Sequence, residues 1–238
     1  MEKIILQNYD NLLKSKLSHL QSHPNYLPHI GENFEEAIQR IMIVAESHYV
    51  DGLITADNWY NNPEEIYTRL IKSIGWFNTR SVLKTYFKQR NLRKIDPALT
   101  IFSNLEKAHK SAFKDINLFD ECVYINYFQR PAEKQGDSIH IDKRDSAIAL
   151  DNLLVLIDVL KIDKIIFVSS KAYKDFIANT TETQLKALPY IGSVPHPSAS
   201  SWWNRKSKKY GTKEIPTATG REKFERIVRI KKTGENKI

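Results

Sequence analysis

The chain has 238 residues, of which 41% are hydrophobic and 27% charged, and this composition is typical of a globular protein with a sizeable core. No apolar run is long enough to cross a bilayer, and the first residues are too polar for a secretory signal. The single cysteine, Cys122, excludes an internal disulfide and a cysteine-based metal site. We therefore expect a protein of the reducing cytoplasm with no membrane contact.

The net charge of +8 is concentrated near one end of the chain. Residues 202–238 hold 12 of the 36 Lys and Arg side chains but only four of the 28 Asp and Glu, so the charges of residues 1–201 balance. A neutral body with a basic C-terminal segment fits a polyanionic partner such as nucleic acid. The alternative is a solvated helix and tail without a partner.

Helical patterns recur along the chain. The spacing of Ile5, Leu12 and Leu20 predicts an N-terminal helix over residues 2–22. Residues 51–62 are interpreted as a loop. Further helices are predicted at 63–73, 81–89, 104–114, 145–160, 171–178 and 220–232, with a short helical piece at 34–38 and frayed residues at the C-terminus.

Four compact apolar runs between these helices predict buried strands, at 41–45, 122–128, 164–168 and 190–194. Strands that alternate with helices indicate an α/β protein. We expect one domain over residues 1–238, built as a three-layer α/β/α fold around a four-stranded, mainly parallel sheet. In such sheets ligands bind beyond the carboxyl ends of the strands.

Polar side chains follow three of these strands. The stretches are Ile-Val-Ala-Glu-Ser-His-Tyr at 43–49, Tyr-Ile-Asn-Tyr-Phe-Gln-Arg-Pro at 124–131 and Val-Pro-His-Pro-Ser-Ala-Ser at 194–200. They resemble three motifs of the uracil-DNA glycosylase superfamily, in the same order, and the likeness extends over about residues 40–205. The resemblance implies a uracil-DNA glycosylase-like fold, DNA as the partner, and hydrolysis of the N-glycosidic bond of a deaminated or damaged base.

The chain departs from the family pattern at two positions of the first motif. Ala45 stands where the family usually has glycine, and Ser47 stands where many members have an aspartate that activates water. Glu46 matches the glutamate of the iron–sulfur branches, but one cysteine cannot hold their cluster. We expect no cofactor and no resident metal, although two histidines with Glu46 could instead ligate zinc.

Three residues carry the expected catalysis. His196 is the candidate hydrogen-bond donor to the departing base, because negative charge develops there as the bond breaks; the alternative is a turn histidine bonded to backbone. Glu46 and Ser47 are the other catalytic candidates, with Glu46 positioning water or contacting the sugar. The alternative for Glu46 is a salt bridge or a cap on the next loop.

Further residues are expected to bind the base. Asn126 offers a donor and an acceptor that can read an amide-like edge, or it satisfies a loop backbone instead. Tyr49 aligns with a tyrosine that guards the base pocket in some members, and packing is the equal alternative. The remaining substrate-binding candidates are His48 and Ser198, and the base-stacking aromatic is expected to be Trp59 or Tyr60.

The segment after the third motif is the expected nucleic-acid interface. Trp202 and Trp203 fall where the family wedges a side chain into the duplex, and the alternative is a lid packed on the sheet. Four cations follow for phosphate contacts: Arg205, Lys206, Lys208 and Lys209.

Three functions compete at this point. The first is a base-excising hydrolase, the second a non-catalytic nucleic-acid-binding protein, and the third a small-molecule hydrolase on the same fold. The missing aspartate favours the second or third, whereas Glu46, Asn126 and His196 together favour the first. Convergence of these three side chains on one cavity would discriminate among them.

Overall fold

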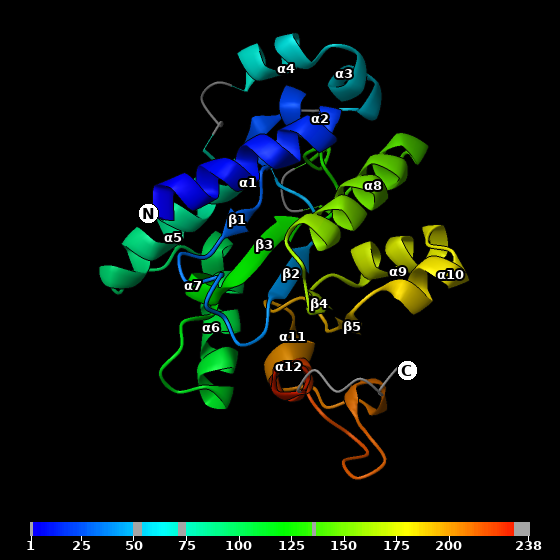
Figure 1. The fold of residues 1–238 in the computed structure, drawn as a ribbon. Coiled ribbons are helices and arrows are strands. Elements are labelled where there is room, and N and C mark those ends of the chain that lie inside the picture. Colours follow the sequence, from blue (N-terminus) through cyan, green and yellow to red (C-terminus); the bar gives the residue numbers. More distant parts are fainter. Residues whose placement is uncertain (1, 50–53, 71–74, 135–136, 231–238) are drawn as a thin grey trace.

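A computed structural model describes residues 2–49, 54–70, 75–134 and 137–230. Its centre is a five-stranded sheet in the order β1-β3-β2-β4-β5 (Figure 1). The strands are β1 (His29–Ile30), β2 (Ile41–Ala45), β3 (Cys122–Asn126), β4 (Lys164–Phe167) and β5 (Tyr190–Ser193).

The mainly parallel sheet is confirmed, and the number of strands is corrected from four to five. β2 pairs in parallel with β3 and β4, and β4 pairs in parallel with β5. The additional strand β1 pairs antiparallel with β3 through two residues only. A strand this short has no alternating or continuous apolar pattern, so the sequence does not reveal it.

The register brings the carboxyl ends of the parallel strands to one edge. Ala45 at the end of β2 lies opposite Asn126 at the end of β3, and Phe167 at the end of β4 lies opposite Ser193 at the end of β5. The segments that leave these strands therefore begin side by side.

Helices cover both faces of the sheet, which gives the expected three layers. Met42 and Val44 of β2 point to one core, formed with α1, α2, α8 and α9. Ile41, Ile43 and Ala45 point to the other core, formed with α5, α6, α11 and α12. This alternation follows from the two-residue period of a strand.

The helices of the described chain are α1 (Glu2–Lys16), α2 (Ser18–Ser22), α3 (Ala56–Asn61), α4 (Pro63–Arg69), α5 (Thr79–Asn91), α6 (Thr100–Ala112), α7 (Leu118–Glu121), α8 (Lys143–Val159), α9 (Ser170–Asn179), α10 (Glu182–Ala187), α11 (Ser200–Trp203) and α12 (Gly220–Arg229). Short 3-10 helices lie at Pro24–Tyr26, Pro97–Leu99 and Lys208–Tyr210. None of the described helices is both long and apolar enough to cross a membrane.

Several predicted boundaries need correction. The N-terminal helix is two helices, because the backbone at Leu17 is extended. Residues 34–38 form turns rather than a helix: Phe34 is buried whereas Ile38 is 93% exposed. Residues 56–61 are helical although a loop was expected, with Thr55 as the N-cap. The predicted residues 71–73 and 231–232, and the expected fraying beyond them, lie outside the described residues.

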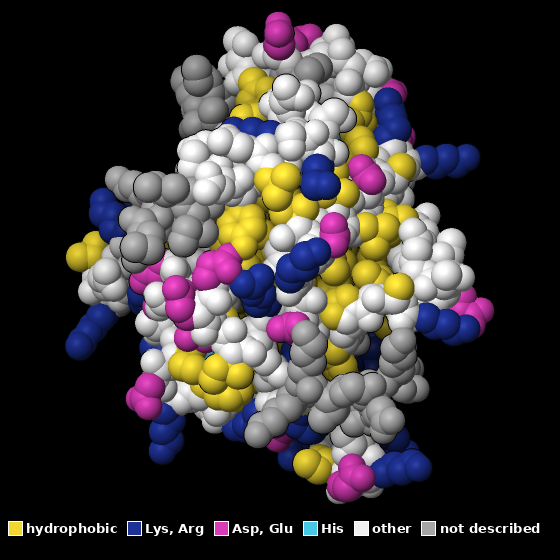
Figure 2. Space-filling view, viewed as in Figure 1, with side chains coloured by type: hydrophobic (Ala, Val, Ile, Leu, Met, Phe, Trp, Pro, Cys, Tyr) yellow, Lys and Arg dark blue, Asp and Glu magenta, His cyan; other side chains and the backbone are white. Residues whose placement is uncertain are grey.

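Hydrophobic side chains and Lys and Arg side chains are unevenly distributed over one face of the molecule. In the view of Figure 2, hydrophobic side chains show in the middle of the face that α1 and α8 cover, and Lys and Arg side chains project mainly at the periphery. Several of them lie at the lower end, where the chain after β5 runs in Figure 1.

Candidate functional site

A cleft of about 560 Å³ lies beyond the carboxyl ends of β2 and β3. One wall is formed by the residues that follow the strands, and the opposite wall by the α5–α6 region. Seven of the residues predicted from the sequence line it: Glu46, Ser47, His48, Tyr49, Asn126, His196 and Ser198. The predicted convergence of Glu46, Asn126 and His196 on one cleft is thus confirmed.

Backbone hydrogen bonds extend the sheet past the strand ends and hold this wall in place. The amide of Phe128 donates to the carbonyl of Glu46 over 2.9 Å, and the amide of Tyr127 donates to the carbonyl of Ala45 over 3.1 Å. Past β5, the amide of Val194 donates to the carbonyl of Phe167 over 2.9 Å. Each polar segment therefore leaves the sheet in a fixed direction.

His196 is presented by a tight turn. The Ser198 amide donates to His196 Nδ1 over 3.2 Å, and the Asn104 side-chain amide, buried on α6, donates to the Pro197 carbonyl over 2.8 Å. His196 is exposed at the surface, yet partial desolvation lowers its pKa, and the carboxylate of Glu46 opposes that shift. Because the Ser198 amide donates to Nδ1, this nitrogen carries no proton and is an acceptor.

The tautomer of His196 follows from this bond. Because Nδ1 accepts, the ring proton of the neutral imidazole sits on Nε2. Nε2 has no hydrogen-bond partner among the described residues. The histidine is bonded to backbone, as the alternative interpretation held, and its other nitrogen still offers an N–H donor to a ligand.

Glu46 is oriented by two hydroxyl groups from separate segments. Ser138 donates to one of its carboxylate oxygens and Ser169 donates to the other over 2.8 Å. Ser169 is also the N-cap of α9. Glu46 forms no salt bridge within the described chain, so the expected alternative of an ion pair is not what holds it.

Asn126 and Ser47 are buried polar groups with capacity left for a ligand. Asn126 is 4% exposed, and its side chain has no hydrogen bond to the described residues. Ser47 is 6% exposed, and its Oγ is buried without a partner in the described structure. An unsatisfied buried hydroxyl costs free energy, and both groups line the cleft, so a bound ligand would satisfy them.

His48 lines the cleft, but its ring is bonded to the protein rather than free for a substrate. Its Nε2 lies 3.1 Å from Thr79 Oγ1, and the ring packs edge-on against Tyr26 with centroids 5.2 Å apart. Burial lowers the pKa of His48 to about 3. We therefore correct its expected role from substrate contact to a link between the end of β2 and the start of α5.

This histidine makes stability depend on pH. A pKa near 3 in the folded state lies below the ordinary value of about 6.5, so the unfolded chain binds the proton first as the pH falls. The stabilisation is complete above pH 6.5 and is lost towards pH 3. We expect the free energy of unfolding to fall between pH 7.5 and 5, by about 2 kcal/mol from this residue. Urea unfolding should show a smaller pH effect for His48→Gln, and an unchanged one for the exposed His140→Gln.

The aromatic candidates for base stacking were wrong. Trp59 is fully buried and stacks on His23 with centroids 4.7 Å apart. Tyr60 donates its hydroxyl to Asp145 over 2.6 Å. Neither lines the cleft.

Other aromatic side chains line it instead, namely Tyr49, Trp76, Phe102 and Tyr124. Tyr124 was within reach of sequence reasoning, because it precedes Asn126 by two residues and so shares its face of β3. Trp76 and Phe102 lie in segments with no motif, and only the fold brings them to the cleft. The same holds for Asp96, which follows α5.

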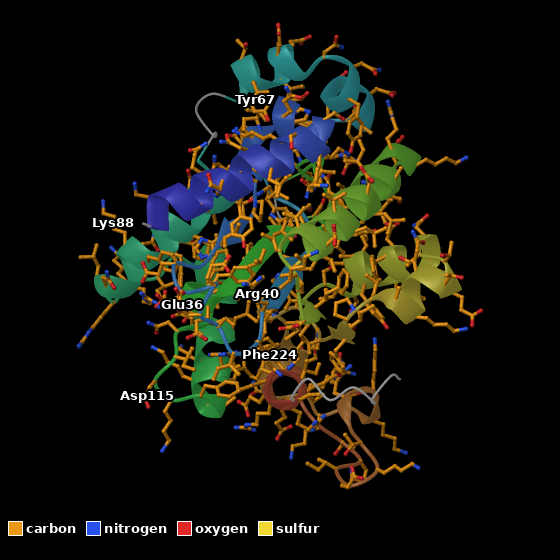
Figure 3. All side chains as sticks on the ribbon, in the orientation of Figure 1. Glu36, Arg40, Tyr67, Lys88, Asp115 and Phe224 are labelled. Atoms are coloured by element: carbon orange, nitrogen blue, oxygen red, sulfur yellow. The ribbon has the colours of Figure 1, made fainter. Side chains whose placement is uncertain are left out.

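The expected duplex wedge is also corrected. Trp202 is fully buried and packs against Phe224 of α12, with ring centroids 5.7 Å apart; Phe224 is labelled in Figure 3. Trp203 is half-buried, and the Arg221 guanidinium lies 4.9 Å from its ring centroid. The lid interpretation therefore holds for Trp202, and Trp203 is not a free wedge. The four cations Arg205, Lys206, Lys208 and Lys209 are exposed.

The site and fold together define a mixed α/β protein with a polar cleft at the carboxyl ends of parallel strands. Within the described residues, no group of three or more His, Cys, Asp or Glu side chains could hold a metal ion. The zinc alternative involving His48, His196 and Glu46 therefore has no support. Comparison with models of known protein families found no match, and no curated protein matched the chain.

Proposed function

We propose that this protein is a uracil-DNA glycosylase-like hydrolase that cleaves the N-glycosidic bond of a damaged or deaminated base in DNA. The convergence of Glu46, Asn126 and His196 on one cleft is the observation that carries the proposal. A protein that only bound nucleic acid would have no need for these three polar groups around one cleft. The sequence motifs quoted above support the same assignment.

The chemistry divides among the three side chains. Cleavage of an N-glycosidic bond builds positive charge on the sugar and pushes electrons onto the leaving base. Glu46, held by Ser138 and Ser169, faces the sugar and the attacking water. His196 Nε2–H donates to a carbonyl oxygen of the base, and the Asn126 amide pairs with the neighbouring base edge. Flipping the nucleotide out of the helix brings these groups within reach.

Activity against a series of base lesions tests the proposal. Single-stranded and duplex oligonucleotides, each with one modified base, are incubated with the protein and cleaved with alkali at any abasic site. We expect release of at least one base above the rate without protein. If no base is released although the oligonucleotides bind, the protein is a nucleic-acid-binding member without catalysis, and the proposal is wrong.

Nucleic acid binding should depend on the exposed cations after α11. Neutralised phosphates release counterions, so the affinity should fall with salt, with a slope of about −0.9 per phosphate contact on duplex DNA. Replacing Arg205, Lys206, Lys208 and Lys209 by alanine should weaken binding and flatten the slope by up to about 3.6. Fluorescence anisotropy titrations at several salt concentrations measure both quantities.

The matched control removes four cations elsewhere, at Lys14 and Lys16 of α1 and Lys84 and Lys88 of α5. It lowers the net charge equally, so an effect of net charge alone would appear in both variants. Equal slopes for the two variants would contradict a specific role of the segment after α11.

A further inference from the structure

The cleft contains two carboxylates and no positive side chain among the described residues that line it. Besides Glu46, it is lined by Asp96, which precedes the 3-10 helix at Pro97–Leu99. Asp96 is fixed on both sides: its Oδ1 accepts from the Ala98 amide over 2.8 Å, and its own amide donates to Gln89 over 2.7 Å. Its second carboxylate oxygen has no partner in the described structure.

Aromatic rings make up much of the remaining wall. Trp76 and Tyr49 are 44% and 38% exposed. Phe102 and Tyr124 are buried behind them in an edge-to-face pair with centroids 5.2 Å apart. The faces of such rings carry a negative partial charge and attract cations. Carboxylates and ring faces together give the cleft a preference for a positively charged planar group.

This electrostatic environment is unfavourable for a neutral base as the leaving group. A neutral base departs with negative charge, which Glu46 and Asp96 repel, and His196 is neutral and supplies a single N–H donor. A base that already carries a positive charge departs as a neutral molecule. Relative to free protein and free DNA, the same environment stabilises both the bound cationic substrate and its transition state, whose total charge is positive, whereas it gives a neutral base no such gain.

We propose that the substrate is a nucleotide whose base is cationic through N-alkylation and carries a carbonyl group, such as N7-methylguanine. This inference rests on the proposed function and narrows its substrate class. The carbonyl oxygen accepts from His196 Nε2–H, the amide-like edge pairs with Asn126, and the positive ring lies against the aromatic wall near Asp96. The cleft has a volume of about 560 Å³, within the range of about 300–1,000 Å³ that is usual for sites of small organic ligands.

The reaction balances without a cofactor. The bond between the sugar C1′ and the base nitrogen breaks, and both electrons go to the base, which cancels its positive charge. The oxygen of a water molecule bonds to C1′, and the proton released from that water passes to Glu46 and then to solvent. A cationic base is a good leaving group, so little activation of the water is required. The low demand for water activation accounts for Ser47 at the position where many members of the uracil-DNA glycosylase superfamily have an aspartate that activates water.

The test compares three oligonucleotides of one sequence that contain N7-methylguanine, uracil or hypoxanthine at the same position. Release of each base is measured in single-turnover reactions at protein concentrations below saturation, which compare the transition state with free protein and free DNA, and a reaction without protein is used to subtract spontaneous loss. We expect N7-methylguanine to be released at least about tenfold faster than either neutral base. Asp96→Asn keeps a side chain that can cap Ala98, and it should lower the ratio of cationic to neutral base release about tenfold, the effect of one partly solvated charge.

Asp115→Asn is the matched control, because this exposed carboxylate lies beyond the opposite end of α6 from the cleft (Figure 3). Both activities should be unchanged in it. Faster release of uracil or hypoxanthine than of N7-methylguanine would overturn the inference and leave the proposed function standing. An unchanged ratio in Asp96→Asn would also overturn it. Release of none of the bases would overturn the inference together with the proposed function.

Discussion

Replacing His196 by alanine should lower the single-turnover rate of base release by about 10² to 10³, the usual effect of removing one preorganised donor. The Ser198 amide fixes the ring through Nδ1, so Nε2–H is aimed before the substrate binds. The donor therefore pays no reorganisation free energy as charge moves onto the base carbonyl. Because the interaction strengthens only as the bond breaks, we expect the rate to fall far more than the affinity for substrate DNA.

His140→Ala is the control for this variant. The His140 side chain is 89% exposed, so its removal should leave the rate unchanged. Circular dichroism and urea unfolding should show that the fold of His196→Ala is intact, since the turn is also held by Asn104. A rate within about threefold of the unmodified protein would show that His196 is a structural turn residue and that another group stabilises the leaving base.

The central sheet could be predicted from the sequence because its strands are continuous apolar runs. All five residues of β2 and all five of β3 are buried, and such runs differ from the amphipathic helices around them. β1 could not be predicted because two residues are too few to show a periodic pattern. α3 could not be predicted because its sequence, Ala-Asp-Asn-Trp-Tyr-Asn, is short and polar. The N-cap at Thr55 and the packing of the buried Trp59 against His23, Tyr26 and Tyr67 stabilise the helix there.

The polar half of the cleft was predictable for a topological reason. Parallel strands bring their carboxyl ends to one edge, so Glu46, Asn126 and His196 meet although they are 80 and 70 positions apart in the sequence. The opposite wall was not predictable. Trp76 and Asp96 come from connections before and after α5, and their positions depend on how that helix packs on the sheet.

Trp202 shows where motif reasoning failed. Two adjacent tryptophans followed by cations suggested exposed aromatic rings, but α11 places the side chain of Trp202 in the hydrophobic core. A close approach of backbone and ring makes this possible: a Cβ on Gly220 would lie 2.2 Å from Cγ of Pro195. Glycine at the start of α12 lets that helix reach the turn before His196, and Trp202 fills the space between them.

Replacing Asp145 by alanine should lower the free energy of unfolding by about 3 kcal/mol, because the buried Arg130 guanidinium loses its fully buried partner and keeps Glu133 as its ion pair within the described chain. Asp145 is fully buried and Arg130 is 1% exposed. Arg130 Nε donates to Asp145 over 2.8 Å, and Tyr60 and the Asp142 amide donate to the same carboxylate over 2.6 and 2.8 Å. Urea unfolding monitored by tryptophan fluorescence measures the loss.

The effect should reach the cleft through the loop that Arg130 holds. The Arg130 guanidinium donates to the His140 carbonyl over 2.6 Å and to Glu133 over 2.7 Å. Ser138, which orients Glu46, lies between these two anchors. We therefore expect Asp145→Ala to lower base release even where the protein is fully folded, in addition to lowering its stability.

Two further variants separate a broken charge pair from lost packing. Asp158→Ala removes an exposed carboxylate of the same helix that pairs only with Lys161, and it should change stability little. The double variant Arg130→Met with Asp145→Leu removes both members of the buried pair and leaves the partly exposed Glu133 without Arg130, so it should regain part of the stability lost by Asp145→Ala. It should not regain base release, since a methionine cannot donate to the His140 carbonyl that positions the loop. If the double variant were as active as the unmodified protein, Arg130 would serve stability alone and Glu46 would be positioned by other contacts.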